Sequence, residues 1–541
     1  MGTTGYLLLT LLPIAVVLLL LVVLKKSATF SGLVGWALIA AVAVAFFRTT
    51  PEVVIRSTLA GMVKSFPISL IVAASLLQMA YMEKSGALKR VIIFIKTIAS
   101  DNQAVQIMII NVGFGTLMVA VGATPVSLLP PIMVAMGYST YVAIALPAIG
   151  YDSLCTYALL GAPVVVFYDI ANGFLVQNQV LAKGHEISLS QIGGVFFLFL
   201  PIVSTMIGLA MLWIVGKWKA IKSGWFPCLL TGGVIALVAF FTNRHDNFVT
   251  LTGVLCGSAI IVAQALYLRL SGRKIIDRSR LTAEELDYER RYPLWKALSP
   301  WILLIVLILA LNVPKDVFNT LYKGLTFPIS GLSANVKDAI KTRFLWNAYT
   351  WILVSTLLSM LFIRPSRAQT GEALKVWGRR APKPVLSAAI FFAIGEVMNM
   401  SGFSMAGQDY TVSSMVRVLA DGSSALFKGA YGGVVAFIGL FGGFLTGSEA
   451  STIAMFGKYT MTTAKNLDWG VAGIILATAG LAFGAGLASV ISPAKLQNAA
   501  ASIDRLGEEN KVIRIAFVFS LIFTAVTTLF LLLFLSLGIR V

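Results

Sequence analysis

The chain has 541 residues, of which 58% are hydrophobic and only 12% are charged, and its formal net charge is +19. With a mean hydropathy of +0.88, a soluble domain would lack polar surface, so repeated long apolar runs predict an all-α polytopic membrane protein. The cations lie in short clusters between these runs. That pattern is typical of cytoplasmic loops and does not favour binding to nucleic acid.

The apolar runs predict about 12 to 14 transmembrane helices. The first run, Tyr6–Leu24, has no basic residue before it and is followed by Lys25 and Lys26. A cleaved signal peptide shows the reverse order, so we expect this helix to remain as a span. In chain order, the candidate spans cover residues 6–24, 30–47, 65–82, 103–121, 138–150, 152–170, 191–215, 225–241, 248–268, 297–313, 343–363, 384–402, 429–446, 469–488 and 514–538.

The loop charges predict an N-terminus outside the cell. Lys and Arg are more numerous in 25–26, 84–90, 217–222, 269–296 and 364–383 than in 48–64, 242–247 and 314–343, and positive loops face the cytoplasm. The mixed charges of residues 278–293 indicate a solvated cytoplasmic helix. We therefore predict an N-terminal membrane half (1–268), a cytoplasmic linker (269–296) and a C-terminal membrane half (297–541).

Two apolar stretches, Val119–Val166 and Phe444–Leu496, are interrupted in the same order. Each begins with a break of glycine and hydroxyl residues and ends at a proline. Paired broken segments in two halves are typical of transporters with inverted repeats and a binding site near the middle of the membrane. We predict two inverted repeats, with broken or re-entrant helices near residues 119–137 and 444–464.

These breaks contain the residue types that bind a small anion. A glycine lets a helix stop, and the free amides at the start of the next helix attract negative charge. Hydroxyl groups can donate to a carboxylate, although any one of them can instead bond its own helix or pack helices closely. We expect the breaks near Gly122 and Gly447 to face each other. The predicted substrate-binding residues are Gly122, Thr124, Thr446, Gly447, Ser448, Ser451, Thr452, Ser492 and Lys495.

Three acidic residues in apolar surroundings are candidates for proton coupling: Glu449, Glu396 and Asp152. An ionisable group at the centre of a membrane helix costs roughly 2.5–3.5 kcal/mol, so it is usually functional. Lys495 could neutralise an anionic substrate. The alternative for Asp152 and Lys495 is a position at the membrane surface, where the charged end reaches water.

Residues for other chemistry are sparse. Cys155, Cys228 and Cys256 lie in or beside apolar segments, and their spacing predicts neither a disulfide set nor a metal site. His185 and His245 fall in predicted loops, and no nucleophile–base motif lies in a span. A channel would call for rings of like groups. We expect a transporter, not an enzyme or a channel, with no cofactor beyond a coupling ion.

The C-terminal break contains "GGFLTGSEAS" at Gly442–Ser451, followed by "ISPAKLQNAAA" at Ile491–Ala501 and a final span. These motifs resemble the signatures of the L-lactate permease family. In the N-terminal half, "LLPIAVVLLL", "VGFG" and "GAPVVV" are in the family's order. The resemblance covers nearly the whole chain, and it maps Thr446, Gly447, Ser448, Glu449 and Ser451 onto one signature and Ser492 and Pro493 onto the other.

The resemblance implies proton symport of L-lactate, and often of D-lactate and glycolate, across the cell (inner) membrane. Na⁺ is the alternative coupling ion, and another small organic anion is the alternative substrate. The chain departs from the family where a glutamate is expected near Val119, and where Ala494 and Lys495 replace a glutamine. The predicted partners are the substrate and the lipid bilayer. The sequence leaves the oligomeric state open, with a homodimer among the options.

Overall fold

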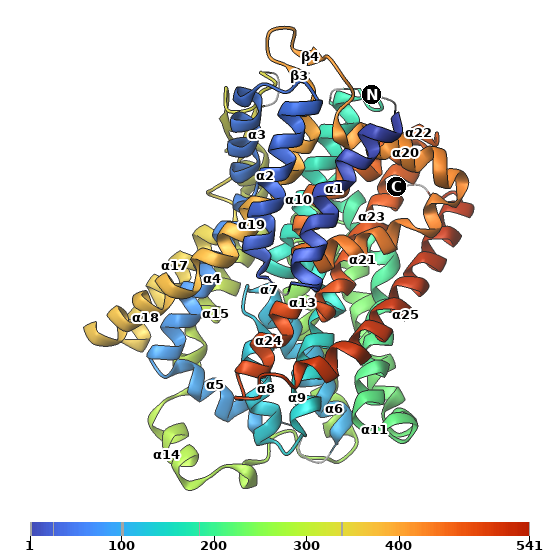
Figure 1. Ribbon diagram of the computed structural model, residues 1–541. Helices are drawn as coiled ribbons and strands as arrows, with labels where there is room; N and C mark the ends of the chain where they lie inside the picture. The colour runs from blue at the N-terminus through green and yellow to red at the C-terminus, as the bar shows by residue number, and fades with distance from the viewer. Residues whose placement is uncertain (1–2, 25, 99–101, 183, 337–338, 540–541) are drawn as a thin grey trace.

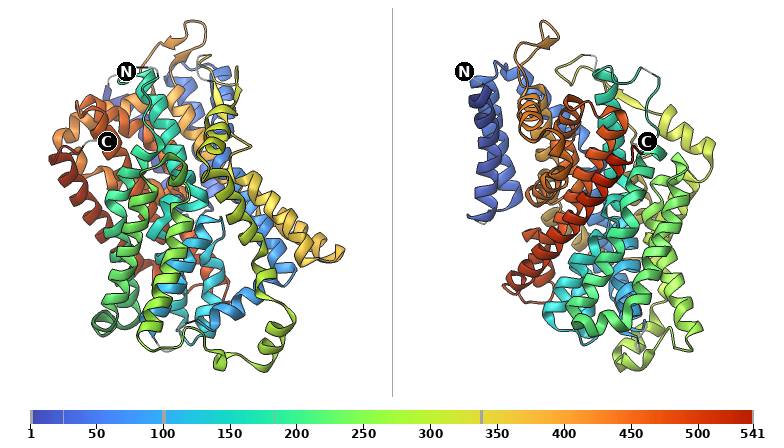
Figure 2. Two further views of the ribbon diagram at one scale, coloured as in Figure 1. Left: turned by 180° about the vertical axis from the view of Figure 1, so that it is seen from behind. Right: turned by 90° about the vertical axis from the view of Figure 1, so that its right-hand side faces the viewer.

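The structure is a computed structural model that describes residues 3–24, 26–98, 102–182, 184–336 and 339–539. It confirms an all-α polytopic membrane protein. Among the described residues, 11 helices are long and apolar enough to cross a membrane, or up to 12 if one bent pair counts as a span. The predicted range of about 12 to 14 overlaps this count only at 12, when the bent pair is counted as a span. The helices form an elongated bundle, with α1 and α2 paired at one edge (Figures 1 and 2).

The N-terminal half begins with five helices: α1 (Thr3–Val22), α2 (Ala28–Phe46), α3 (Pro51–Lys64), α4 (Phe66–Lys84) and α5 (Ala87–Lys96). A run of α6 (Gln103–Ile107), the π-helix η1 (Met108–Phe114) and α7 (Gly115–Ala120) comes next. The half continues with α8 (Pro125–Ala135), α9 (Thr140–Gly150), the 3₁₀ helix η2 (Tyr151–Tyr157), α10 (Ala158–Gln177), α11 (Leu189–Thr242), α12 (Asp246–Val249) and α13 (Thr252–Leu270).

The linker contains η3 (Arg278–Arg280) and α14 (Ala283–Arg291). The C-terminal half then runs through α15 (Leu294–Asn312), α16 (Lys315–Asn319), η4 (Thr320–Gly324), β1 (Phe327–Ile329), β2 (Ile340–Thr342), α17 (Ala348–Ile363), α18 (Arg367–Arg380) and α19 (Pro382–Met400). It ends with β3 (Phe403–Ser404), β4 (Asp409–Tyr410), α20 (Met415–Phe427), η5 (Lys428–Gly433), α21 (Val435–Thr446), α22 (Glu449–Asn466), α23 (Gly470–Leu487), η6 (Ala488–Ile491), α24 (Pro493–Ala501) and α25 (Glu509–Ser536). The strands form two short antiparallel pairs, β1–β2 and β3–β4.

One predicted loop contains a helix, and two predicted spans lie in one long helix. Residues 48–64 were expected to be a loop, but they contain α3, which begins with the Thr50 cap and a proline in its first turn. These are ordinary helix-start signals. The predicted spans 191–215 and 225–241 lie in α11, whose backbone leaves helical geometry at Gly216 and Lys217. The basic cluster there marks the turn between the two spans.

Helices from the two halves of the sequence interleave. α19 packs against α2, α3 and α4 of the N-terminal half and against α22 of its own half. Glycines permit some of these contacts, since a Cβ at Gly61 would lie 2.6 Å from the Cα of Ala393 and one at Gly395 would lie 2.6 Å from the carbonyl oxygen of Ala454. Small residues at helix crossings allow such close approach in membranes. The division into two halves, and their inverted repeat, stay predictions.

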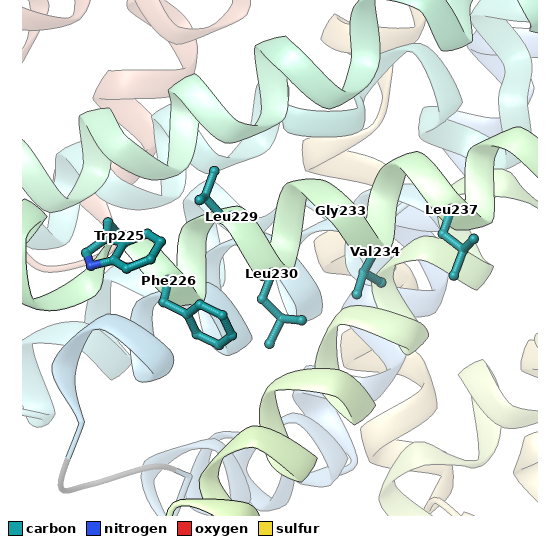
Figure 3. Close-up of a pocket in the computed structure, with 7 residues that line it drawn as sticks. All are labelled: Trp225, Phe226, Leu229, Leu230, Gly233, Val234 and Leu237. Atoms are coloured by element: carbon teal, nitrogen blue, oxygen red, sulfur yellow. The ribbon is translucent and has the colours of Figure 1, made fainter.

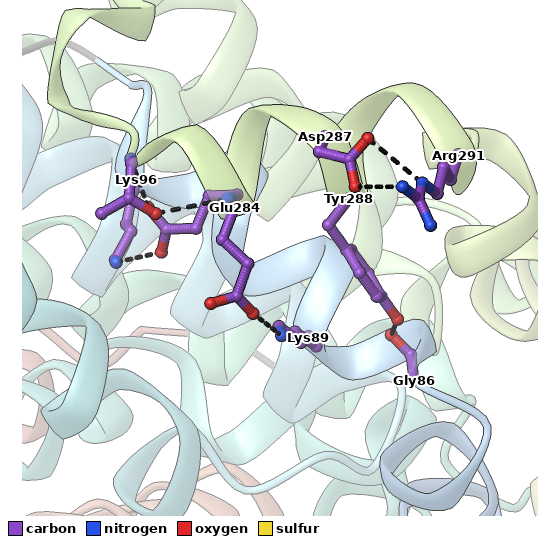
Figure 4. Close-up of polar contacts among 9 residues, drawn as sticks. Gly86, Lys89, Lys96, Glu284, Asp287, Tyr288 and Arg291 are labelled. Carbon is purple, nitrogen blue, oxygen red and sulfur yellow. Dashed lines mark hydrogen bonds and ion pairs between the residues drawn. The ribbon is translucent and has the colours of Figure 1, made fainter.

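The linker helix α14 lies on α5, at the end of the bundle opposite the start of α1 (Figures 1 and 4). Its start is a capping box formed by Thr282 and Glu285. Lys89 pairs with Glu284 at 3.0 Å, Lys96 pairs with Glu285, and the Tyr288 hydroxyl donates to the Gly86 carbonyl at 2.9 Å. The predicted helix is therefore present, and ion pairs fix it to α5.

Candidate functional site

The predicted break at Gly447 separates α21 from α22. Gly447 has φ = +69°, and Ser448 is extended and caps α22 with its hydroxyl oxygen, which accepts from the Ser451 N–H at 3.4 Å. Glycine adopts this left-handed conformation at low cost. The helix direction therefore changes at this glycine, and Glu449 is the first residue of the new helix.

Several hydroxyls of this break bond to the break itself. Thr446 and Thr452 lie 2.9 Å apart through their hydroxyl oxygens, and both donate to the Ser448 carbonyl at 2.9 Å. The hydroxyl groups of these two residues therefore already donate to the backbone of their own break, as hydroxyls in helices often do. Ser451 differs: its hydroxyl is buried and has no hydrogen-bond partner among the described residues. A buried, unpaired hydroxyl is rare, so Ser451 has bonding capacity for a ligand.

Glu449 joins this break to the N-terminal half. Its carboxylate is 5% exposed and accepts hydrogen bonds from Cys155 Sγ and Thr156 Oγ1, both at 3.0 Å. Neither donor is among the site residues predicted from the sequence. The signal for them was the polar stretch "YDSLCTY" inside an apolar run, directly before Ala158.

The donors to Glu449 belong to a break of their own. η2 contains a non-helical residue at Leu154, and Leu159, Leu160 and Gly161 follow with φ of +53°, +55° and +74°. A left-handed conformation costs roughly 1–2 kcal/mol for a residue other than glycine. Two such leucines in succession are backbone outliers, and outliers of this kind cluster at functional sites.

This arrangement corrects the expected pairing of breaks. The predicted partner of Gly447 was the stretch Gly122–Thr124, whose break is present, with Gly122 at φ = +89°. Gly122 instead lies against its own half, where a Cβ would be 3.4 Å from Leu159 and would overlap Ser75. Thr124 is exposed and precedes α8 without capping it by its side chain.

The two stretches instead meet crosswise. α22, after the first C-terminal break, packs against α10, after the second N-terminal break. α24, after the second C-terminal break, packs against α8, after the first N-terminal break. From sequence order we expected the first break of one stretch to contact the first break of the other. Instead, the first break of each stretch lies near the second break of the other, as in an antiparallel arrangement.

The second C-terminal break brings two more predicted residues toward Glu449. A Cβ at Gly447 would lie 3.5 Å from Ser492 Oγ, so Ser492 borders the first break. Lys495, one turn further on, interacts electrostatically with Glu449. Gly486 on α23 closes the site, because a Cβ there would lie 3.0 Å from Glu449 Oε2 and would overlap Cys155 Sγ.

Glu396 lies in a different environment. It is buried on α19, accepts a hydrogen bond from Lys64 Nζ at 2.9 Å, and has Lys458 Nζ at 4.0 Å. The two ammonium groups compensate its charge and tie α19 to α3 and α22. Asp152 belongs to η2, but its side chain lies outside the described residues.

Other candidate chemistry is not assembled. Within the described residues, no group of three His, Cys, Asp or Glu side chains could hold a metal ion. His185 and His245 are exposed in loops. The open hollow in Figure 3 is almost entirely apolar and lies on one face of α11, so it suits lipid chains and not a polar solute. Its lining residues are Trp225, Phe226, Leu229, Leu230, Gly233, Val234 and Leu237.

Many apolar spans, with broken helices that enclose polar side chains, define a membrane transport protein. A model of the L-lactate permease family matches residues 6–538, so the chain belongs to this family. The chain is thus a multi-pass transporter and not an enzyme.

The curated relatives match along nearly their whole length. The glycolate permease GlcA of Escherichia coli (strain K12) is 24% identical over 96% of this chain and 94% of its own. The L-lactate permease of Salmonella typhi is 25% identical over 95% and 93%, respectively. The L-lactate permease of Bacillus subtilis (strain 168) is 22% identical over 93% and 91%.

Proposed function

We propose that the protein imports a small 2-hydroxymonocarboxylate together with protons across the cell membrane. L-lactate is the first candidate substrate, with D-lactate and glycolate beside it. Support comes from the family and from relatives that are named for lactate and glycolate. The substrate is an anion at neutral pH, and moving one charge against 100 mV costs about 2.3 kcal/mol. A co-transported proton cancels this cost.

The observation that carries the proposal is the contact of Glu449 with Cys155 and Thr156. An ionised carboxylate only accepts hydrogen bonds, whereas a protonated one also donates. Proton uptake by Glu449 would therefore rearrange the bonds that join the two broken stretches. Its hydrogen-bond donors Cys155 and Thr156 are neutral, and Lys495 adds a positive charge that interacts with the carboxylate.

The substrate carboxylate would bind beside this carboxyl group. The positive end of the α22 dipole and the Ser451 hydroxyl would attract the anion at the break, and Lys495 supplies positive charge. A proton on Glu449 would remove the repulsion between two carboxylates at close range. Binding of substrate and of proton would then favour each other, which is the coupling that symport needs.

The Glu449→Gln variant tests the proposal in proteoliposomes. Gln keeps the size of the side chain but holds no exchangeable acidic proton. We expect the variant to lose accumulation of labelled lactate driven by a pH gradient, while exchange of internal for external lactate continues. Normal accumulation by the variant would remove Glu449 from the coupling step.

Na⁺ is the second candidate for the coupling ion, and one cluster favours it. Thr116 Oγ1 and Ser153 Oγ lie 3.3 Å apart beside η2, Ser153 donates to the Gly150 carbonyl at 2.9 Å, and Ser204 donates to the Ser153 carbonyl at 2.8 Å. Neutral oxygens at an unwound helix suit Na⁺. Full uptake in Na⁺-free buffer would exclude this alternative, and uptake that requires Na⁺ would replace the proton.

A further inference from the structure

A small chamber lies beside the N-terminal break, and two of its lining residues, Leu159 and Leu160, follow the Glu449 contacts Cys155 and Thr156 in the chain. Leu159 and Leu160 of the left-handed segment form one wall, and residues of α4, α15 and the start of α17 form the others. Its free volume is about 20 Å³, which is room for about one water molecule. A three-carbon acid can occupy the chamber only if a wall moves. The strained pair of leucines follows Thr156, which contacts Glu449, by three and four positions in the chain.

The N-terminus of α17 opens on this chamber. Asn347 and Ala348 line it, Asn347 is the N-cap residue, and no side chain caps the first amides of this 16-residue helix. Uncapped amides and the helix dipole together make such an end attractive to an anion. Thr250 and Asn312 add polar groups, and Ile308 adds an apolar surface.

Trp346 provides an independent sign of a ligand. It lines the same chamber and is 8% exposed, and its indole N–H is buried without a hydrogen-bond partner among the described residues. Buried donors are normally paired, so we expect the Trp346 indole N–H to bond an acceptor on a ligand. An indole N–H and helix amides are donors only, and a carboxylate offers several acceptor sites.

The segment that presents these donors is firmly held. Arg343 forms a bidentate ion pair with Asp169 of α10, with nitrogen–oxygen distances of 3.0–3.1 Å. Its Nε donates to the Tyr322 carbonyl at 3.1 Å. The amides of Trp346 and Asn347 donate to the Arg343 carbonyl at 2.9 and 2.8 Å. The donors are therefore oriented before a ligand arrives, which lowers the entropic cost of binding.

We infer that the N-terminus of α17 and the Trp346 indole form a second carboxylate site, which holds the small 2-hydroxymonocarboxylate beside the break at Leu159 and Leu160. The inference rests on the proposed function and deepens it. The substrate's carboxylate accepts from the α17 amides and Trp346, and its short carbon chain lies against Ile308 and Leu159. Movement of Leu159 and Leu160 then joins the chamber to the Glu449 site.

The test compares two pairs of variants of the full-length protein, reconstituted in proteoliposomes. Trp346→Phe removes the indole donor, and Trp301→Phe is its control because the Trp301 indole is equally buried and unpartnered but lies outside the chamber lining. Asn347→Asp and Asn347→Ser both cap a helix well, so both should fold, but only the former adds negative charge. Elution profile and melting temperature check the fold of each variant.

We expect Trp346→Phe and Asn347→Asp each to raise the KM for lactate by about tenfold, because each weakens a charged hydrogen-bonding site. Trp301→Phe and Asn347→Ser should keep the wild-type KM. A wild-type KM in both Trp346→Phe and Asn347→Asp would overturn the inference and leave the proposed function standing. A wild-type protein that carries no 2-hydroxy acid would overturn the proposed function, and this inference with it.

Discussion

The Thr156 hydroxyl donates to the Glu449 carboxylate at 3.0 Å across 293 positions of the chain. Each residue lies at a helix break, one in each half of the sequence. The contact therefore joins the two interrupted stretches at a single ionisable group. Any rearrangement of one break that moves Glu449 therefore changes the hydrogen bonds of the other break.

Loss of the Thr156 donor should slow transport strongly. Thr156→Val keeps the shape of the side chain but removes a hydrogen bond to a carboxylate, and such bonds are worth about 1.5–3 kcal/mol. We expect lactate uptake by Thr156→Val to fall by roughly tenfold or more. Thr156→Ser retains the hydroxyl and serves as the control. Equal uptake by the two variants would show that transport does not depend on the Thr156 hydroxyl.

Gly486 should tolerate no side chain. The Cβ of Gly486→Ala would overlap Cys155 Sγ and lie 3.0 Å from Glu449 Oε2, so the carboxylate or its donors must shift. We expect the maximal uptake rate of this variant to fall at least about tenfold, since small displacements at a working site are costly. Gly233→Ala is the matched control, because nothing lies within 4 Å of its Cβ. Normal uptake by Gly486→Ala would contradict the described geometry.

The ion pairs of Glu396 should contribute mainly to stability. In Glu396→Gln, Lys64 and Lys458 lose their common carboxylate, and removal of one partner from a buried pair costs about 3–5 kcal/mol. We expect a corresponding loss in the free energy of unfolding in detergent. Glu372→Gln breaks only an exposed pair with Lys375 and should change little. If both variants unfold like the wild type, the buried cluster is not a structural link.

The docking of α14 on α5 should resist moderate acid. Burial raises the pKa of Glu285, but the bonds from Lys96 and from Thr282 outweigh it, so the pKa of Glu285 lies below its ordinary value. Because its pKa is lowered, ionised Glu285 stabilises the docked helix fully at a pH above the ordinary pKa of a carboxyl group. This stabilisation is lost as the pH falls through the lowered pKa of Glu285. We expect the helix to stay docked at pH 5 and above, about where ordinary carboxyl groups are ionised.

Hydrogen exchange at neutral pH checks this docking. Glu285→Gln mimics the acid form, so exchange of the α14 amides should be faster than in the wild type. Glu284→Gln is the control, since the pair of Glu284 with Lys89 is largely exposed and such pairs are worth little. Unchanged protection in Glu285→Gln would mean that apolar contacts, and not this pair, hold α14.

The sequence indicated the fold class and the presence of breaks because both depend on local patterns. Long apolar runs need no tertiary information, and a glycine next to hydroxyl residues, as at Gly447, signals a helix end by itself. The α3 helix was missed although Thr50 and Pro51 are helix-start signals, because its polar residues resembled those of a loop.

The site was harder to predict because its contacts are far apart in the chain. The pairing of Glu449 with residues 155–156, in place of the break at Gly122, depends on the antiparallel packing of two stretches, which no local signal specifies. Glu396 was a candidate for coupling because it is an acidic residue between apolar neighbours in the sequence. Once Lys64 is placed on α3, the carboxylate has a structural partner.

The most direct test of the central claim, that Glu449 takes the coupling proton at the junction of the two breaks, is the ratio of protons to lactate entering proteoliposomes. A pH-sensitive dye inside the vesicles and labelled lactate outside report both fluxes at once. For the wild type, about one proton should enter with each lactate, because that ratio makes uptake electrically neutral. In Glu449→Gln, lactate exchange should continue without proton movement. A ratio near the wild-type value in Glu449→Gln would contradict the claim.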